Sequence, residues 1–191
     1  VLYKEDYAKL DFYENLNYPF GNSIYQENSD INPKAAELFS EKSKVTKSGM
    51  TLDTLREMFG FPMPDLIKLD VQGAELDVLA GAKQTLQTVQ GIILEAQHVE
   101  YNKNAPKFKE VVAYLDNLGF ELAATIRENE TDGDYYFTRK HVDPTKKRLE
   151  ELRELPGIFP TSHFEFLNKE LKQKGIEPKT IYDIGACVLH W

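Results

Sequence analysis

The chain has 191 residues, 41% of them hydrophobic and 28% charged, which is enough for one soluble domain with a sizeable core. Its net charge of −8 at pH 7 argues against a nucleic-acid binder, which presents a basic face, although an anionic cofactor held by backbone N–H groups stays compatible. The single cysteine, Cys187, excludes an internal disulfide and favours a reducing, cytoplasmic setting, and no apolar run approaches the length of a membrane span.

The first third of the chain predicts two short strands and a short helix. Apolar residues alternate at Leu10 and Phe12, and a loop rich in Asn, Pro and Gly follows. The segment 44–61 then predicts a strand and a helix, which Thr51 or Asp53 would cap at its N-terminus.

The middle of the chain alternates between apolar runs and helical spacing. Residues 64–73 and 91–101 read as buried strands, because each is a short apolar run closed by polar residues. Residues 74–89 and 105–120 have one apolar face at helical spacing, and Gly119 suits the C-terminal cap of the second helix. This order predicts parallel βαβ units with right-handed crossovers.

A hairpin and two helices complete the predicted elements. Residues 120–126 and 134–140 are strand-like and flank a polar turn with a glycine, which predicts an antiparallel hairpin at one edge of the sheet. Residues 141–180 predict a charged helix and an amphipathic helix. The fold class is therefore α/β, with a mostly parallel sheet and an antiparallel edge hairpin.

The last eleven residues, IYDIGACVLHW, read as a strand that runs into a glycine turn. A strand ending in Asp-X-Gly places Asp183 and Gly185 at the carboxyl edge of a parallel sheet, where open α/β sheets bind ligands. A full dinucleotide fingerprint has more glycines than this stretch. A cofactor loop and an ordinary strand-to-helix turn both fit the pattern.

Two further clusters of polar residues follow predicted strands. Asp70 and Gln72 end the first strand, and Glu75 opens the helix after it, where it would equally complement the helix dipole. Glu95 and His98 lie at the end of the next strand. A histidine beside acids is a candidate general base, whereas a hydrogen-bonded surface histidine is the plainer alternative, and the spacing gives only weak support for a metal.

Taken together, the motifs of residues 21–140 resemble those of the FkbM family of S-adenosylmethionine-dependent methyltransferases. The resemblance is carried by GNSIY, MTLDTL, DLIKLDVQGAELDVLAGA, GIILEAQHVEY, LDNLGF and DYYFTRK. The family shows Ile-Lys-Leu-Asp-Val-x-Gly-Ala-Glu, and Gln72 stands where Glu is commoner. The terminal IYDIGACVLHW looks like the family's first motif, the S-adenosylmethionine loop, changed at Cys187.

The resemblance implies a Rossmann-like class I methyltransferase that moves a methyl group from S-adenosylmethionine to a hydroxyl, on a sugar or glycan acceptor. On this reading we assign no residue to a metal, and we predict these site residues: Asp183, Gly185, Ala186, Asp70, Gln72, Asn22 and Ser23 for the cofactor, and His98, Glu95 and Asp70 for catalysis. His98 is the first candidate base, and Glu95 either orients it or is the base itself. Two rivals remain: a nucleotide-dependent oxidoreductase, and a non-catalytic methyltransferase-like module of a larger glycan-processing protein.

The order of the motifs differs from that of the family, in which the glycine loop comes first. The strand–helix–strand unit expected after the loop, roughly 30 to 40 residues, is not in this sequence. A circular permutation, a segment spanning two methyltransferase units, or an omitted segment would each explain the order. We expect residues 1–140 to form the catalytic block, and residues 141–191 to be a helical lead-in and cofactor-loop strand that belongs before residue 1.

Overall fold

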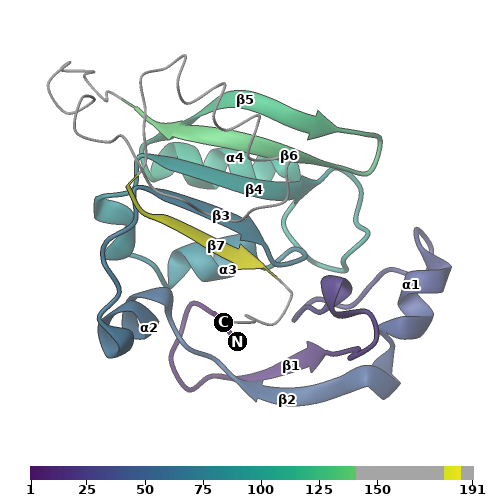
Figure 1. The fold of residues 1–191 in the computed structure, drawn as a ribbon. Helices are drawn as coiled ribbons and strands as arrows, with labels where there is room; N and C mark the ends of the chain where they lie inside the picture. The colour runs from purple at the N-terminus through teal and green to yellow at the C-terminus, as the bar shows by residue number, and fades with distance from the viewer. Residues whose placement is uncertain (141–178, 186–191) are drawn as a thin grey trace, which may run out of the picture.

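The computed structural model describes residues 1–140 and 179–185, and these form one larger sheet, one small sheet and several helices (Figure 1). The larger sheet has five strands in the order β5-β6-β4-β3-β7. Its strands are β3 (Leu66–Asp70), β4 (Gly91–Gln97), β5 (Phe120–Glu128), β6 (Asp132–Arg139) and β7 (Ile181–Gly185).

The larger sheet is mixed. β3 pairs in parallel with β4 on one side and with β7 on the other. β6 pairs antiparallel with both β4 and β5, so the predicted hairpin at the sheet edge is confirmed. The expectation of a mostly parallel sheet is not confirmed for the described residues, because β6 makes antiparallel pairs on both of its sides.

The small sheet comes from the N-terminal third of the chain. β1 (Lys9–Tyr13) pairs antiparallel with β2 (Lys44–Ser48), as the alternation at Leu10 and Phe12 predicts for the first of them. α2 (Leu52–Phe59) follows β2, and the Thr51 hydroxyl accepts a hydrogen bond from the Thr54 amide at its N-terminus. Thr51 is therefore the cap of this helix.

The other helices are α1 (Pro33–Leu38), α3 (Glu75–Ala80) and α4 (Phe108–Asn117). α4 agrees with the prediction, and Gly119 follows it with the positive φ of +82° that suits a C-terminal cap. α3 is much shorter than the predicted helix over 74–89. The Asp53 carboxylate accepts hydrogen bonds from the backbone amides of Gln84 and Thr85 at 2.8 Å, and so holds a separate short turn there.

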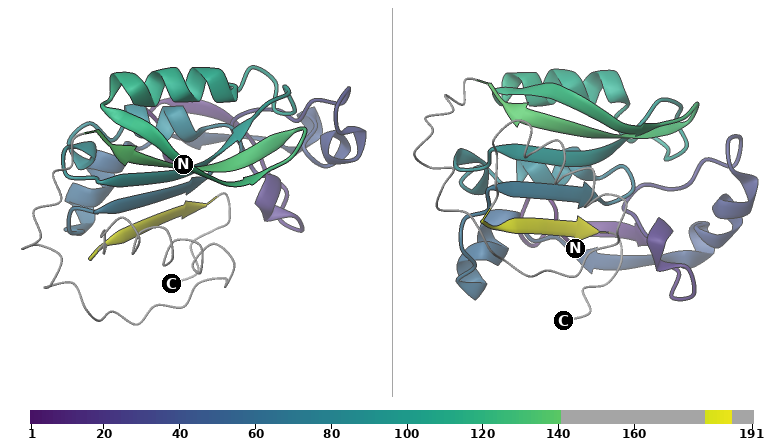
Figure 2. Two further views of the ribbon diagram at one scale, coloured as in Figure 1. Left: turned by 90° about the horizontal axis from the view of Figure 1, so that it is seen from above. Right: turned by 45° about the horizontal axis from the view of Figure 1, so that its top comes forward.

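The two faces of the larger sheet are covered differently. The main core lies on the side of α3 and α4 (Figure 2), and it includes the fully buried Ile67, Ile92 and Leu94. On the other face Leu66, Ile93 and Tyr136 form a smaller buried cluster. Charged residues follow this cluster towards the carboxyl ends of β3 and β4, where Asp70 and Glu95 lie, and the antiparallel β6 brings Asp134 opposite Glu95.

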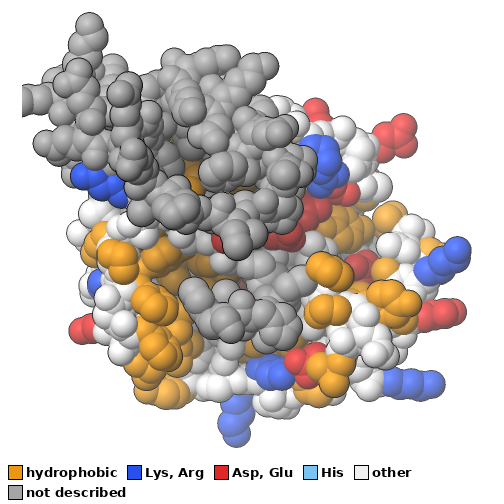
Figure 3. Space-filling view, viewed as in Figure 1, with side chains coloured by type: hydrophobic (Ala, Val, Ile, Leu, Met, Phe, Trp, Pro, Cys, Tyr) orange, Lys and Arg blue, Asp and Glu red, His pale blue; other side chains and the backbone are white. Residues whose placement is uncertain are grey.

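Hydrophobic side chains also reach the surface. Figure 3 shows them gathered near α2, and the end of this helix exposes Met58 and Phe59. Among the helices described here, none is both long enough and apolar enough to cross a membrane. The helices predicted within residues 141–180 lie outside the described residues, as does Ala186.

Candidate active site

The candidate site lies at the carboxyl ends of β3, β4 and β7. These three strands run in parallel, so their ends meet at one edge of the sheet. The register sets Gly185 of β7 directly beside Asp70 of β3. Two motifs that are more than a hundred residues apart in the sequence are therefore neighbours in the fold (Figure 1).

The turn after β3 has an unusual backbone. Gln72 has φ +52° and Gly73 has φ +93°, and the left-handed region is costly for a residue such as Gln72. The Ser23 hydroxyl donates a hydrogen bond to the Gln72 carbonyl at 2.7 Å. A Cβ at Gly73 would lie 2.6 Å from the Ala105 Cβ, so both backbone angle and space require glycine.

The buried side chain of Glu75 stabilises the same turn through hydrogen bonds with the backbone. Its carboxyl Oε1 accepts hydrogen bonds from the amides of Val71 at 3.1 Å and Gly73 at 3.4 Å. Burial raises the pKa of Glu75 to about 7, although these backbone hydrogen bonds act in the opposite direction. Glu75 therefore holds the turn in place, in addition to opening α3.

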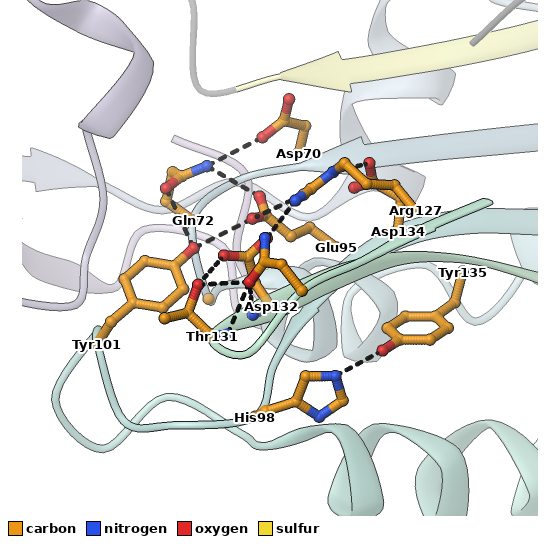
Figure 4. A network of polar contacts seen from close by, with 12 residues as sticks. Asp70, Gln72, Glu95, His98, Tyr101, Arg127, Thr131, Asp132, Asp134 and Tyr135 are labelled. Atoms are coloured by element: carbon orange, nitrogen blue, oxygen red, sulfur yellow. Dashed lines mark hydrogen bonds and ion pairs between the residues drawn. The ribbon is translucent and has the colours of Figure 1, made fainter. Parts of the chain in front are cut away.

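Gln72 and Tyr101 hold Glu95 from two sides (Figure 4). The Gln72 amide Nε2 lies 3.1 Å from Asp70 Oδ1 and 3.2 Å from Glu95 Oε2, so it donates to both carboxyl groups. The Tyr101 hydroxyl lies 3.3 Å from Glu95 Oε1 and 3.4 Å from Gln72 Oε1. The structure thus brings together Asp70, Gln72 and Glu95, as the sequence predicts.

The β5–β6 hairpin adds a cation to this group. Arg127 pairs with Asp132 at 2.6 Å and with Asp134 at 2.9 Å, and its Nη2 lies 3.7 Å from Glu95 Oε1. Two carboxylates already share the guanidinium charge. The surroundings of Glu95 consequently remain acidic.

Glu95 is the most perturbed carboxyl group of this cluster. Burial, together with the negative charges of Asp70, Glu75 and the two hairpin aspartates, raises the pKa of Glu95 to about 8. Its side chain is 16% exposed, so it remains within reach of a ligand. Such a group donates a hydrogen bond at neutral pH and accepts a proton once it is ionised.

His98 lies elsewhere. Its Nε2 is 2.8 Å from the Tyr135 hydroxyl and 3.0 Å from Glu128 Oε1, and its ring meets Phe108 edge-on. Figure 4 shows this pair apart from the Glu95 cluster. β4 ends at Gln97, so His98 lies in the bend after the strand that carries Glu95, and its contacts are with other elements. The expected orienting contact between them is not among the hydrogen bonds and ion pairs of the described residues.

The strand β7 brings the predicted cofactor acid to the same edge. Asp183 Oδ1 lies 3.2 Å from Lys68 Nζ of β3, and Lys68 also lies 3.9 Å from Asp70. Lys68 therefore links β7 to β3. Of the predicted loop residues, Asp183 and Gly185 are described, and Ala186 lies outside the described residues.

A cavity of about 730 Å³ opens beside β7. Its polar lining includes Asp183, Asn22 and Ser23, with Gly185 at the strand end. Its apolar walls come from both sheets and from α2, and include Leu2, Phe12, Met50, Leu52, Leu55, Val71, Ile181 and Ile184. The predicted Asn22 and Ser23 are buried here, and Asn22 Oδ1 accepts a hydrogen bond from the Asn15 amide at 2.8 Å.

Three residues of the site were not predicted from the sequence: Lys68, Tyr101 and Arg127. Lys68 is a charged residue within an apolar strand, and Tyr101 ends the motif that contains Glu95. Both positions could therefore have been recognised from the sequence as candidates for the site. Arg127 could not, because only the pairing of the hairpin with β4 brings it near Glu95. Within residues 1–140 and 179–185, no group of three or more His, Cys, Asp or Glu side chains is placed to hold a metal ion.

The structure defines an α/β protein with a polar site at the carboxyl ends of parallel strands, which is where such sheets bind ligands. A family model described as the methyltransferase FkbM domain matches residues 8–122. The chain therefore belongs to the FkbM family of methyltransferases. The matched region contains Asp70, Gln72, Glu95 and Tyr101.

A curated relative supports the same assignment. The chain is 29% identical over 117 residues to the hexuronic acid methyltransferase AglP of Haloferax volcanii, a match that covers 61% of this chain. The match covers 46% of that relative, so the chain spans about half the length of the relative. No solved structure matches the chain significantly.

Proposed function

We propose that this protein is a Rossmann-like class I methyltransferase that moves a methyl group from S-adenosylmethionine to a hydroxyl of a sugar or glycan. Family membership supports the methyl transfer, and the name of the relative supports a sugar acceptor. The observation that carries the proposal is the register that sets Gly185 beside Asp70. This pairing of β7 with β3 supports the proposal that the strand of the cofactor loop and the catalytic block share one edge of the sheet, as expected if residues 1–140 and 141–191 belong to one fold.

The described residues fit S-adenosylmethionine. A cavity of about 730 Å³ lies within the size range of small-molecule sites, roughly 300–1,000 Å³. Such sites are mostly apolar with a few polar groups, and here Asp183, Asn22 and Ser23 are among the polar groups. The other polar residues of the lining include Glu14, Lys47, Ser48 and Thr180. Asp183 and Gly185 would hold the cofactor from β7, and Asp70 and Gln72 would face it from β3.

The cofactor supplies a methyl group on a sulfonium, which is already activated for displacement. The protein has two tasks: to align the acceptor oxygen with that methyl, and to remove the acceptor proton. We assign the proton to Glu95, because its raised pKa matches a base that works near neutral to mildly alkaline pH. The His98 ring interacts with the Tyr135 hydroxyl and the Glu128 carboxyl group, outside the Glu95 cluster. Glu95 is therefore the better of the two predicted candidates for the general base.

Asp70 and Gln72 have orienting roles in this proposal. Gln72 spans the carboxyl groups of Asp70 and Glu95, so it fixes the distance between the strand end of β3 and the base. A neighbouring hydroxyl of the sugar that donates to Asp70 would then place the reacting hydroxyl, with its own proton, beside Glu95. Ser23 contributes by holding the Gln72 carbonyl.

The test is transfer of a tritium-labelled methyl group from S-adenosylmethionine to neutral and acidic sugar acceptors. We expect Glu95→Gln to lower kcat by about 100-fold or more, as for loss of a general base. Glu121→Gln, which removes an exposed carboxylate from β5, is the matched control and keeps wild-type turnover. Full activity of Glu95→Gln would remove Glu95 from the mechanism.

The alternative is a methyltransferase-like binding module without turnover. The single glycine of the Asp183–Gly185 loop favours it, because cofactor loops of this kind usually have more glycines. Binding of S-adenosylhomocysteine with no methyl transfer to any acceptor tested would support this alternative.

A further inference from the structure

We propose that Tyr101 is a positioning residue whose hydroxyl follows the charge of Glu95, donating to Glu95 when it is ionised and to Gln72 when it is protonated. The inference rests on the proposed function, in which Glu95 is the base. It adds a residue that sequence reasoning missed, and it gives that residue a role that can be measured apart from turnover.

The geometry gives the Tyr101 hydroxyl two acceptors and one proton. Glu95 Oε1 lies at 3.3 Å and Gln72 Oε1 at 3.4 Å, so the two positions are almost equally distant. A hydrogen bond to a charged carboxylate is stronger than one to a neutral amide, so the Tyr101 hydroxyl donates to Glu95 when Glu95 is ionised. Once Glu95 is protonated, the neutral Gln72 carbonyl becomes the competitive acceptor.

Gln72 completes the arrangement on the other oxygen. Its Nε2 donates to Glu95 Oε2 at 3.2 Å, so each carboxyl oxygen of Glu95 has one neutral donor. Two such donors stabilise the ionised form and keep the carboxyl plane in one orientation. Burial raises the pKa of Tyr101 far above its ordinary value, which keeps the phenol protonated and makes it a donor rather than a base.

The loop that carries Tyr101 is fixed by its backbone. The Tyr101 carbonyl accepts a hydrogen bond from the Asn28 amide at 2.6 Å. Asn102, the residue after Tyr101, is held by the buried Gln97 side chain. The backbone amide of Asn102 donates to Gln97 Oε1 at 3.0 Å, and Gln97 Nε2 donates to the backbone carbonyl of Asn102. The hydroxyl therefore reaches Glu95 from a rigid position.

One segment, residues 23–28, supports both donors to Glu95. At one end Ser23 holds the Gln72 carbonyl, and at the other end Asn28 holds the Tyr101 carbonyl. Because this segment lies between the two contacts, it sets the spacing of Gln72 and Tyr101 around the carboxyl group. This gives the predicted Ser23 a supporting role in addition to its place in the cavity lining.

The ionisation of Glu95 responds to groups on every element around it. These are Asp70 on β3, Glu75 on α3, Asp132 and Asp134 on β6, and Arg127 on β5. The negative charge of Glu27, in the supporting segment, also raises the pKa of Tyr101. All of them remain in place when only the Tyr101 hydroxyl is removed, so a Tyr101→Phe variant isolates its contribution.

The experiment follows the ¹³C signal of the Glu95 carboxyl group with pH, assigned by its loss in Glu95→Gln. We expect Tyr101→Phe to move the Glu95 midpoint upward by about one pH unit, a tenfold loss of the ionised form at a given pH. Tyr25→Phe is the matched control, because Tyr25 lies in the same supporting segment and donates to a different carboxylate, Asp77, at 2.7 Å. It should leave the Glu95 midpoint unchanged.

The same variants are then assayed for kcat against pH. A rising limb that moves with the carboxyl midpoint supports both the inference and the role of Glu95 as base. A midpoint that moves while the kcat profile stays fixed supports the Tyr101 contact and removes Glu95 as the base. An unchanged Glu95 midpoint in a folded Tyr101→Phe protein overturns the inference.

Discussion

Replacing Glu95 with glutamine should reduce the loss of folding stability that the wild-type protein shows as pH rises. The folded protein raises the pKa of Glu95 from 4.5 to about 8, mainly by burial. Between these values the folded state holds a proton that the unfolded state has lost, so the stability of the wild type falls as pH rises. Glutamine keeps the shape of the side chain and stays neutral, so this loss disappears.

The magnitude follows from the two pKa values. Each tenfold change in an ionisation constant is worth about 1.4 kcal/mol, so the difference between 4.5 and about 8 corresponds to at most about 5 kcal/mol. The side chain keeps 16% exposure, and water reaching the ionised group reduces the effect, so we expect about 3 kcal/mol.

The assay is urea unfolding of wild type and Glu95→Gln at about pH 5 and about pH 9, which span most of the interval between the two pKa values. The advantage of the variant over the wild type should grow by about 3 kcal/mol between the two conditions. Glu121→Gln controls for the loss of one negative charge at an exposed position. Equal differences at both pH values would refute the reasoning that burial of Glu95 raises its pKa.

Three smaller changes test the support of the site, each by urea unfolding. Gly73→Ala should cost about 3 kcal/mol because it adds a clash to a positive φ, whereas Gly60→Ala, at a positive φ in open space, should cost only about 1 kcal/mol. Similar costs would show that the space around Gly73 is not restricted. Ser23→Ala should cost about 1–2 kcal/mol because it leaves the Gln72 carbonyl without its partner, and no change would mean that water replaces the hydroxyl. Thr51→Ala should cost about 1 kcal/mol through loss of the α2 cap, and no loss would show that the cap is dispensable.

The local patterns predicted the strand and helix identities well. The apolar runs before Asp70 and Glu95 became the central strands β3 and β4, and Gly119 ended α4 as its spacing indicated. These features depend on periodicity and caps, which are local properties of the chain. The length of α3 was wrong, because the Asp53 carboxylate, which lies far away in the sequence, stabilises a separate turn where the helix was expected to continue.

The site was predictable where parallel strands decide the neighbours. Since β3, β4 and β7 end at one edge, Asp70, Glu95 and Asp183 were placed together by the strand pattern and the family resemblance. The partnership of Glu95 with His98 stays a prediction, and the contacts that the structure gives His98 are with Tyr135 and Glu128. β4 ends at Gln97, so proximity in sequence does not place His98 on the strand that carries Glu95. The contact between Arg127 and Glu95 depends on hairpin pairing, which the sequence pattern does not locate.

The most direct test of the central claim is calorimetric titration of the 191-residue chain with S-adenosylhomocysteine. The claim is that the β7 strand with Asp183 and the β3 turn with Asp70 form one cofactor site. It predicts binding with a dissociation constant of about micromolar order, weakened about tenfold or more by Asp183→Ala. No heat of binding, or equal binding by Asp183→Ala, would contradict it.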